Sequence, residues 1–136
     1  MSSNIVAGVD SRSSGAERLS IAQVSQHTGL SIDTLRYYER AGLLPPVARD
    51  GAGRRRYGQR DLGWLALIRC LRDTGMPLQL IRTFTGLAAQ GDPSLPQRIG
   101  ILREHDRALA ATIAELRGHQ RYLRGKLRDY EERLTS

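Results

Sequence analysis

The 136-residue sequence has one cysteine, Cys70, and three histidines. A single thiol excludes an intrachain disulfide framework, an iron–sulfur cluster held by several thiolates and a multi-cysteine metal site. His105 and His119 fall on one predicted helix, where their spacing separates them by about 21 Å, too far to share an ion within one chain. The sequence therefore predicts neither a metal site nor a cofactor.

Long apolar runs are also missing. No stretch approaches the length of a membrane span and no signal peptide is evident, so we expect a cytoplasmic protein. Cys70 has no evident His–Asp or His–Asn arrangement to make it a nucleophile, and no glycine-rich phosphate loop is present. We therefore predict that the protein is not an enzyme, and an enzyme using Cys70 is the weakest hypothesis.

Acidic residues are fewer than basic ones. There are 14 Asp and Glu against 21 Lys and Arg, which gives a net charge of +7. This excess favours a polyanionic partner, although a merely basic soluble protein can have the same total. Between Arg36 and Arg60, however, seven arginines accompany only two acids, Glu39 and Asp50. The positive charge is thus concentrated in one segment, as DNA binding requires.

Residues 20–44 predict two short helices joined by a tight turn. Ser20 is a suitable N-cap for a helix that continues to about His27. Gly29 then supplies the turn, and Ser31 starts the second helix. This spacing is typical of a helix-turn-helix whose second helix enters a major groove, although a plain helical hairpin fits the pattern alone.

The second helix has an apolar and a polar face. Leu35 and Tyr38 share the inward face with Ile32. The other side carries a hydroxyl, a phenol and two guanidiniums, which can reach phosphates or base edges. Together with the first N-cap, the predicted DNA contacts of this unit are Ser20, Thr34, Arg36, Tyr37 and Arg40.

A basic segment follows Pro45 and Pro46, which end the second helix. Residues 49–57 combine a Gly-rich turn with three consecutive arginines. The pattern predicts a small β-hairpin wing, and the alternative is a mobile solvated loop. Wing contacts to phosphates and groove edges set affinity more than sequence choice. The predicted contacts are Arg54, Arg55, Arg56 and Tyr57, with Arg55 as an outward-facing cation.

Two further helices are predicted, at 62–73 with Asp61 as its cap and at 78–89. Trp64 belongs to the apolar stripe of the first and is expected in the core.

From residue 99 onward, apolar residues alternate at spacings of three and four over about five heptads, which is a strong coiled-coil pattern. An isolated helix with this stripe would be sticky, so it requires a partner helix. The predicted dimerisation residues are Ile99, Leu102, Leu109, Ile113, Leu116, Leu123, Leu127 and Tyr130.

Residues 19–62 closely resemble the N-terminal DNA-binding domain of the MerR family of bacterial transcription regulators. The shared features are the turn Gly29, the run Thr34-Leu35-Arg36-Tyr37-Tyr38-Glu39, the exit Gly42-Leu43-Leu44, and Arg55 and Tyr57 followed by Asp61-Leu62. The resemblance implies a mainly α fold, in which a winged helix-turn-helix domain precedes a long C-terminal helix that pairs antiparallel with that of a second subunit. It also implies a homodimer that distorts a palindromic promoter spacer read by RNA polymerase. The competing hypothesis is a coiled-coil interaction module or antagonist without sequence-specific DNA binding.

Cys70 has two interpretations. Free cysteine is often buried, which favours a small core residue. Arg69 and Arg72 lie nearby in sequence, and cations favour the reactive thiolate. Residues 67–76 are also similar to the AdhR/NmlR-like single-cysteine subgroup of the family, which implies that Cys70 senses electrophiles such as aldehydes or nitrosothiols.

The sequence divides at changes in composition. The first part is rich in Ser and Gly and has no helical or strand period, so we expect it to be disordered. The predicted parts are an N-terminal extension at 1–17, a winged helix-turn-helix domain at 18–90, a linker at 91–97 and a dimerisation coiled coil at 98–136.

Overall fold

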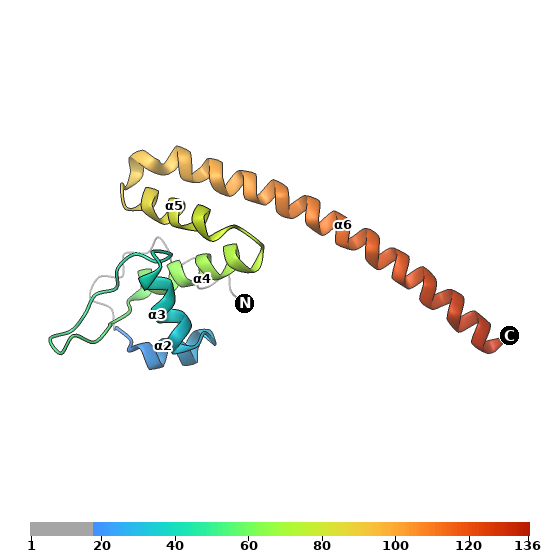
Figure 1. Ribbon diagram of the computed structural model, residues 1–136, viewed down its shortest axis with the longest axis horizontal. Helices are drawn as coiled ribbons and strands as arrows, with labels where there is room; N and C mark the ends of the chain where they lie inside the picture. Colours follow the sequence, from blue (N-terminus) through green and yellow to red (C-terminus); the bar gives the residue numbers. More distant parts are fainter. Residues whose placement is uncertain (1–17) are drawn as a thin grey trace. The chain divides into compact units, whose positions relative to one another are not determined.

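The computed structural model describes residues 18–136, and the predicted disordered extension lies outside this range (Figure 1). The described chain is mainly helical, as predicted, and contains two isolated antiparallel bridges but no strand. It forms two compact units, the first ending at Arg98 and the second comprising Ile99–Ser136. In chain order the elements are α2 (Ile21–Thr28), α3 (Ile32–Arg40), α4 (Gln59–Asp73), α5 (Leu78–Ala88), the 3-10 helix η2 (Asp92–Ser94) and α6 (Leu95–Thr135).

Local capping defines the helix-turn-helix formed by α2 and α3. Ser20 caps α2, because its Oγ accepts a hydrogen bond from the Gln23 N–H at 3.2 Å while Gln23 Oε1 accepts from the Ser20 N–H at 2.8 Å. The helix ends at Gly29, whose φ of +78° is readily adopted only by glycine. Ser31 caps α3 by accepting from the Thr34 N–H at 3.0 Å. The predicted helix-turn-helix is confirmed.

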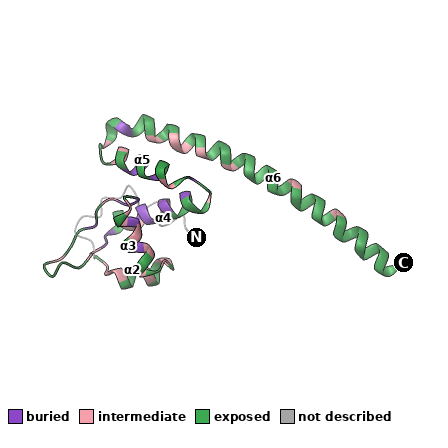
Figure 2. Ribbon diagram, in the orientation of Figure 1, coloured by how far each residue is buried: buried purple, intermediate pink, exposed green. Residues whose placement is uncertain are grey.

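The core of the first unit joins α3 to the helix pair α4 and α5 (Figure 2). Trp64 is 6% exposed, which confirms its predicted place in the core, and its ring centroid lies 5.9 Å from that of Phe84. Aromatic and aliphatic burial of this kind supplies most of the stability of such a unit. The buried hydrophobic residues are Val24, Leu35, Tyr38, Leu43, Leu44, Val47, Tyr57, Trp64, Leu65, Ile68, Leu71, Met76, Ile81 and Phe84.

The start of α4 differs from the prediction. The helix begins at Gln59, with Gly58 as its N-cap, rather than at residue 62. Asp61 still caps it, but from within the first turn, because its Oδ2 accepts from the Gly58 N–H at 2.8 Å. A side chain that reaches back from the third helical residue satisfies the same orphan amide as an N-cap would.

One arginine of α4 and one of α5 bind the C-terminal ends of α2 and α3. Arg69 donates from Nη1 to the carbonyl oxygen of Thr28, at the end of α2. Arg82 donates from Nε to the carbonyl oxygen of Ala41, just after α3, at 2.7 Å. Cations at helix C-termini stabilise the free carbonyls and the negative end of the dipole. These two contacts fix the helix-turn-helix against the helix pair.

The long helix α6 begins at Leu95, inside the segment predicted as a linker. The buried Ser94 precedes it and donates from Oγ to the Leu87 carbonyl oxygen at 2.6 Å, while Arg98 Nε donates to Ser94 Oγ at 2.9 Å. None of the 41 residues of α6 is buried. Across residues 18–136, no helix combines the length and apolar character that a membrane span needs.

Candidate nucleic-acid interface

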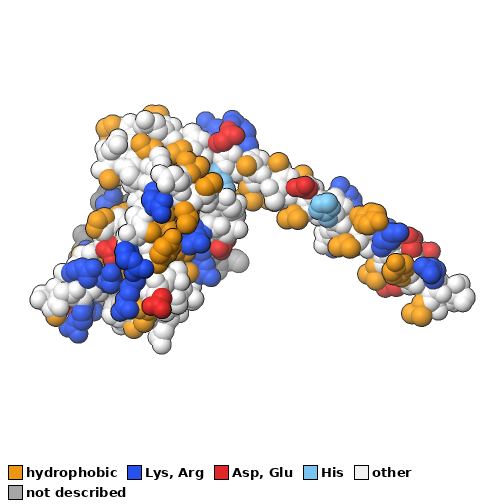
Figure 3. All heavy atoms as spheres, in the orientation of Figure 1, with side chains coloured by type: hydrophobic (Ala, Val, Ile, Leu, Met, Phe, Trp, Pro, Cys, Tyr) orange, Lys and Arg blue, Asp and Glu red, His pale blue; other side chains and the backbone are white. Residues whose placement is uncertain are grey.

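The outer face of α3 carries exposed cations. Arg36 and Arg40 are exposed, and the Arg36 side chain, 51% exposed, has only a 4.0 Å contact with the exposed Asp33. Arginine side chains gather over this part of the first unit (Figure 3). Contacts between such exposed charges are weak in water, so Arg36 keeps its capacity to bind a phosphate or a base edge.

The other predicted contacts of the helix-turn-helix have local hydrogen bonds or partial burial. Thr34 is half-buried, and its Oγ1 accepts from Ser31 Oγ at 2.9 Å. Ser20 is half-buried and caps α2. Tyr37 is half-buried, with its ring centroid 6.4 Å from that of Tyr38. These three residues are thus less exposed than Arg36 and Arg40.

Asp50 organises the turn of the wing, residues 47–57. Its Oδ1 accepts from the N–H groups of Ala52 and Arg54 at 2.9 and 3.0 Å, and its Oδ2 accepts from Arg56 Nε at 3.1 Å. The Arg54 N–H, above all, and then Arg56 lower the pKa of Asp50 against the opposing effect of burial. One antiparallel bridge, between Arg49 and Arg55, links the two arms. The wing is thus a tight turn with a single bridge, shorter than the predicted β-hairpin.

Glu39, in the last turn of α3, reaches both arms of the wing. Its Oε2 accepts from the Val47 N–H at 2.9 Å, its Oε1 accepts from Arg55 Nε, and Arg49 Nη2 lies 4.0 Å from the same Oε1. Burial is the largest single influence and raises the pKa of Glu39. The hydrogen bonds from Arg55 and Val47 together with the arginine charges outweigh it, so the pKa is lowered. Glu39 is therefore a charged, partly buried junction between helix and wing.

Two of the predicted wing contacts, Arg55 and Tyr57, have side chains that do not face outward. Tyr57 is fully buried, and its backbone is paired to Leu19 at 2.7 Å in both directions. Arg55 is only 20% exposed and its Nε is bound to Glu39. In extended backbone, alternate side chains face opposite sides. Residues 55 and 57 therefore face inward, whereas the side chains of Arg54 and Arg56 are 72% and 34% exposed.

The sequence reasoning missed the roles of Glu39 and Asp50. Both were counted only as the two acids of the Arg-rich segment, yet each binds arginines of the wing. The usable signal was their isolation, because a single acid among many cations is well placed to pair with several of them. Arg49 was not among the predicted contacts either. Its side chain is 47% exposed, and its Nη1 donates to the Gly53 carbonyl oxygen at 3.0 Å.

Comparison with known proteins identifies the chain's relatives. Residues 19–85 match the family described as "MerR HTH family regulatory protein", and residues 62–126 match "MerR, DNA binding". The chain belongs to the MerR family. It is a DNA-binding transcriptional regulator of that family, and its relatives are regulators rather than enzymes. The match does not favour the alternative of a coiled-coil module that lacks DNA binding.

Three relatives show how far the MerR likeness extends. An uncharacterized HTH-type transcriptional regulator of Haemophilus influenzae is 37% identical over 111 residues, which is 82% of each chain. The regulator AdhR of Bacillus subtilis is 40% identical over 91 residues, or 67% of this chain and 65% of AdhR. The crystal structure of HiNmlR, described as a MerR family regulator lacking the sensor domain and bound to promoter DNA, is 36% identical. It superposes with a TM-score of 0.80 over 85% of this chain and 91% of that one.

Cys70, the lone thiol of this MerR-family chain, is exposed on α4. The interpretation as a small core residue is therefore wrong for the described chain. Its neighbour Arg69 is the residue that binds the end of α2. Within residues 18–136, no group of three or more His, Cys, Asp or Glu side chains is arranged to hold a metal ion.

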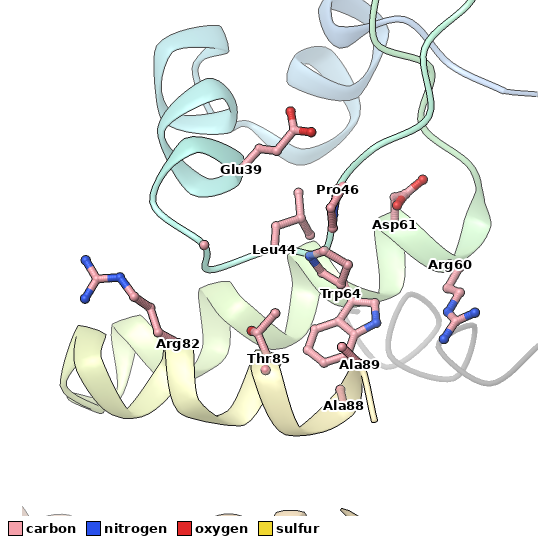
Figure 4. Close-up of a pocket in the computed structure, with 13 residues that line it drawn as sticks. Glu39, Leu44, Pro46, Arg60, Asp61, Trp64, Arg82, Thr85, Ala88 and Ala89 are labelled. Atoms are coloured by element: carbon pink, nitrogen blue, oxygen red, sulfur yellow. The ribbon is translucent and has the colours of Figure 1, made fainter. Parts of the chain in front are cut away.

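A cavity of about 550 Å³ lies between α3, the start of α4 and α5 in this MerR-type domain (Figure 4). Trp64, Leu44 and Pro46 are among its apolar lining residues, and Glu39 and Asp61 are its carboxylates. Burial raises the pKa of Asp61, against the effects of the Gly58 N–H and the Arg18 charge. Both carboxylates already bind parts of the fold: Glu39 joins α3 to the wing, and Asp61 caps the start of α4.

Proposed function

We propose that this MerR-family protein acts in the cytoplasm as a homodimeric transcriptional regulator of a promoter. The observation that carries the proposal is the pairing of two cation-bearing elements, α3 and the wing, through Glu39. Exposed arginines on two linked elements suit a helix in the major groove with a flanking contact to the backbone. The promoter DNA bound to HiNmlR, a relative of similar fold, supports the same use of this surface.

Within this proposal, the α3 residues read the groove and the wing binds phosphates. Arg36 and Arg40 are the principal contacts of α3, with Thr34 and Tyr37 beside them and Ser20 near the start of α2. Arg54 and Arg56 are the wing contacts, because their side chains, 72% and 34% exposed, lie on the side of the wing opposite to Arg55 and Tyr57. Phosphate contacts give affinity that falls steeply with salt, whereas base contacts give sequence choice.

A second copy of the chain pairs antiparallel with α6. The support is the exposed apolar stripe of this helix, including Ile113, Leu116, Leu123 and Leu127, which are 40–66% exposed. A stripe of this kind in a helix with no buried residue is the pattern of an unpaired coiled coil. The remaining seam positions of the proposed interface are Ile99, Leu102, Leu109 and Tyr130.

The dimer acts by distorting the DNA between two half-sites of a palindrome. Two rigid DNA-binding heads that hold separate half-sites can twist or bend the spacer, at an energetic cost that depends on its sequence. The distortion realigns the promoter elements that RNA polymerase reads.

Cys70 is the proposed site of effector response, to electrophiles such as aldehydes or nitrosothiols. Its exposure gives such reagents access. An adduct on this residue lies next to Arg69, and a shift of Arg69 would loosen its bond to the end of α2. The proposal also rests on the resemblance of residues 67–76 to the AdhR/NmlR-like subgroup, and AdhR is 40% identical over 67% of this chain.

The test is footprinting of the purified full-length protein on genomic fragments, followed by gel shifts on the protected sequence. We expect protection of a palindromic site by a complex of two chains, and weaker binding as salt increases. Binding that shows no sequence preference against an excess of unrelated duplex would contradict the proposal.

A further inference from the structure

The Glu39 carboxylate connects α3 with both arms of the wing. It accepts a hydrogen bond from the Val47 N–H on the first arm and from Arg55 Nε on the second. Arg49 Nη2 lies 4.0 Å from Glu39 Oε1. The side chain is only 14% exposed. A carboxylate with this many donors in a partly desolvated place holds its partners more firmly than a surface ion pair does.

Beyond its two buried end residues, Val47 and Tyr57, the wing is exposed or half-buried. Its arms share one bridge, between Arg49 and Arg55, and its turn is organised internally by Asp50. Its base is held by the backbone pair between Leu19 and Tyr57. A hairpin this short is marginal by itself, so its position beside α3 depends on the bonds that connect it to the domain.

We propose that Glu39 is a positioning residue for DNA binding, which holds the wing where its arginines and those of α3 contact one half-site together. The inference rests on the proposed function. It names Glu39 as the residue that joins the two DNA-contacting elements, α3 and the wing, into one surface. Elements that are already ordered with respect to each other lose less conformational entropy on binding. Once α3 is bound to DNA, a fixed wing also holds its arginines close to the neighbouring DNA phosphates. The effective concentration of these arginines at the phosphates is then high.

Charge adds a second reason. Arg49 and Arg55 both approach the Glu39 Oε1 atom. Without this anion the two guanidiniums, one on each arm, would lack their shared partner in a partly buried site, and their mutual repulsion would push the two arms apart and disturb the geometry of the wing. The acid therefore favours binding of a polyanion although its own charge opposes it.

The test is a double-mutant cycle in the full-length protein between Glu39→Gln and Arg54→Gln. Glutamine at 39 keeps an acceptor for the Val47 N–H and removes the charge, whereas Arg54 is the most exposed arginine of the wing. The matched control is Glu104→Gln, which alters an exposed Glu–Arg pair on α6, where Arg107 lies at 3.0 Å. Affinity for the footprinted duplex is measured by fluorescence anisotropy, below the unfolding temperature of every variant.

We expect Glu39→Gln to weaken binding by about tenfold, as the loss of a charge-assisted hydrogen bond predicts. Glu104→Gln should leave affinity unchanged. Arg54→Gln should lower DNA affinity in the wild-type background. It should lower affinity much less in the Glu39→Gln background, because a wing that is not fixed no longer holds Arg54 against a DNA phosphate. If Glu39 only stabilised the fold, Arg54→Gln would cost the same in both backgrounds.

Equal cost in both backgrounds, or wild-type affinity of Glu39→Gln, overturns the positioning role. If Glu39→Gln does not fold, Arg55→Lys replaces it in the cycle, since lysine keeps the charge but not the geometry of Nε. The same two outcomes then decide. Absence of specific binding by the wild-type protein would instead overturn the proposed function and this inference with it, so the two failures are distinguishable.

Discussion

The phenol of Tyr57 lies fully inside the first unit, and its hydroxyl is the one buried side-chain polar atom of the described residues that lacks a hydrogen-bond partner. Burial raises its pKa, as expected for an acid whose charged form is desolvated. We predict that Tyr57→Phe raises the free energy of unfolding by about 1–2 kcal/mol, because it removes an unsatisfied buried group without changing shape. Thermal and urea unfolding measure this, and operator affinity should stay the same. A weaker complex would restore Tyr57 as a DNA contact.

Glu39 and Asp61 are carboxylates with opposite responses to pH. The pKa of Glu39 is lowered in the folded protein, so its contribution to stability is present above its unfolded pKa and is lost as pH falls through the folded pKa. The pKa of Asp61 is raised mainly by burial, so the folded state loses stability as pH rises from the unfolded pKa through the folded one. Both windows lie near the ordinary carboxyl range of about 3–5.

We therefore predict opposite pH trends for two amide variants. Relative to wild type, Glu39→Gln should become less stable as pH rises through this window, and Asp61→Asn should become more stable. Denaturant unfolding at several pH values measures both. Parallel trends would show that one of the two pKa directions is wrong.

At the scale of elements, α3 and the wing carry arginines with different tasks. Arg36 is half exposed on α3, and Arg55 is held by Glu39. We predict that Arg36→Ala weakens operator binding by about 1–3 kcal/mol with no change in melting temperature. Arg55→Ala should lower stability by a comparable amount, since it leaves a partly buried carboxylate without its main partner. Calorimetry and gel shifts separate the two effects, and an unchanged melting temperature for Arg55→Ala would argue that its bond to Glu39 is dispensable.

The sequence predicted those elements whose limits are set by local chemistry. The caps Ser20 and Ser31 and the turn Gly29 act within a few residues, so the helix-turn-helix could be placed from the pattern alone. The start of α4 could not, because backbone pairing of Tyr57 with Leu19, distant in sequence, leaves Gly58 as the N-cap.

The sequence analysis also did not predict which wing side chains face inward and which face outward. The three consecutive arginines were treated as one exposed group, although period-two alternation places Arg55 on the side of Tyr57. The acid that selects this arrangement, Glu39, lies sixteen residues before Arg55. Pairings over that distance depend on the fold and are not readable from local propensity.

At the scale of the whole molecule, an effector at Cys70 must change what the DNA-binding surface does. We predict that short aldehydes or nitrosothiols change output from the target promoter in cells with the wild-type protein and not in cells with Cys70→Ser. Because Cys70 is exposed, the serine variant should keep its stability within about 0.5 kcal/mol and should bind the operator normally. Reporter output with and without electrophile measures the response, and equal induction of both proteins would exclude Cys70 as the sensor.

The assembly of the whole molecule depends on α6. In the single chain Ile113 and Leu116 are 40% and 60% exposed, so aspartate at both positions costs a lone helix little. In a paired coiled coil the same side chains fill the seam, where unpaired charges are expensive to bury. We predict that Ile113→Asp with Leu116→Asp gives a monomer with unchanged folding of the first unit and strongly weakened operator binding. Sedimentation equilibrium, circular dichroism and gel shifts measure the three properties.

The matched control places the same two charges, at the same spacing, outside the seam. Ala111 and Ala114 are exposed and fall at heptad positions away from the apolar stripe. Ala111→Asp with Ala114→Asp should therefore remain dimeric and bind the operator as wild type does. If both double variants dissociate, charge alone explains the effect; if the Ile113 and Leu116 variant stays dimeric, another surface holds the two copies together. Dissociation confined to the seam variant is the result that assigns dimerisation to this face of α6.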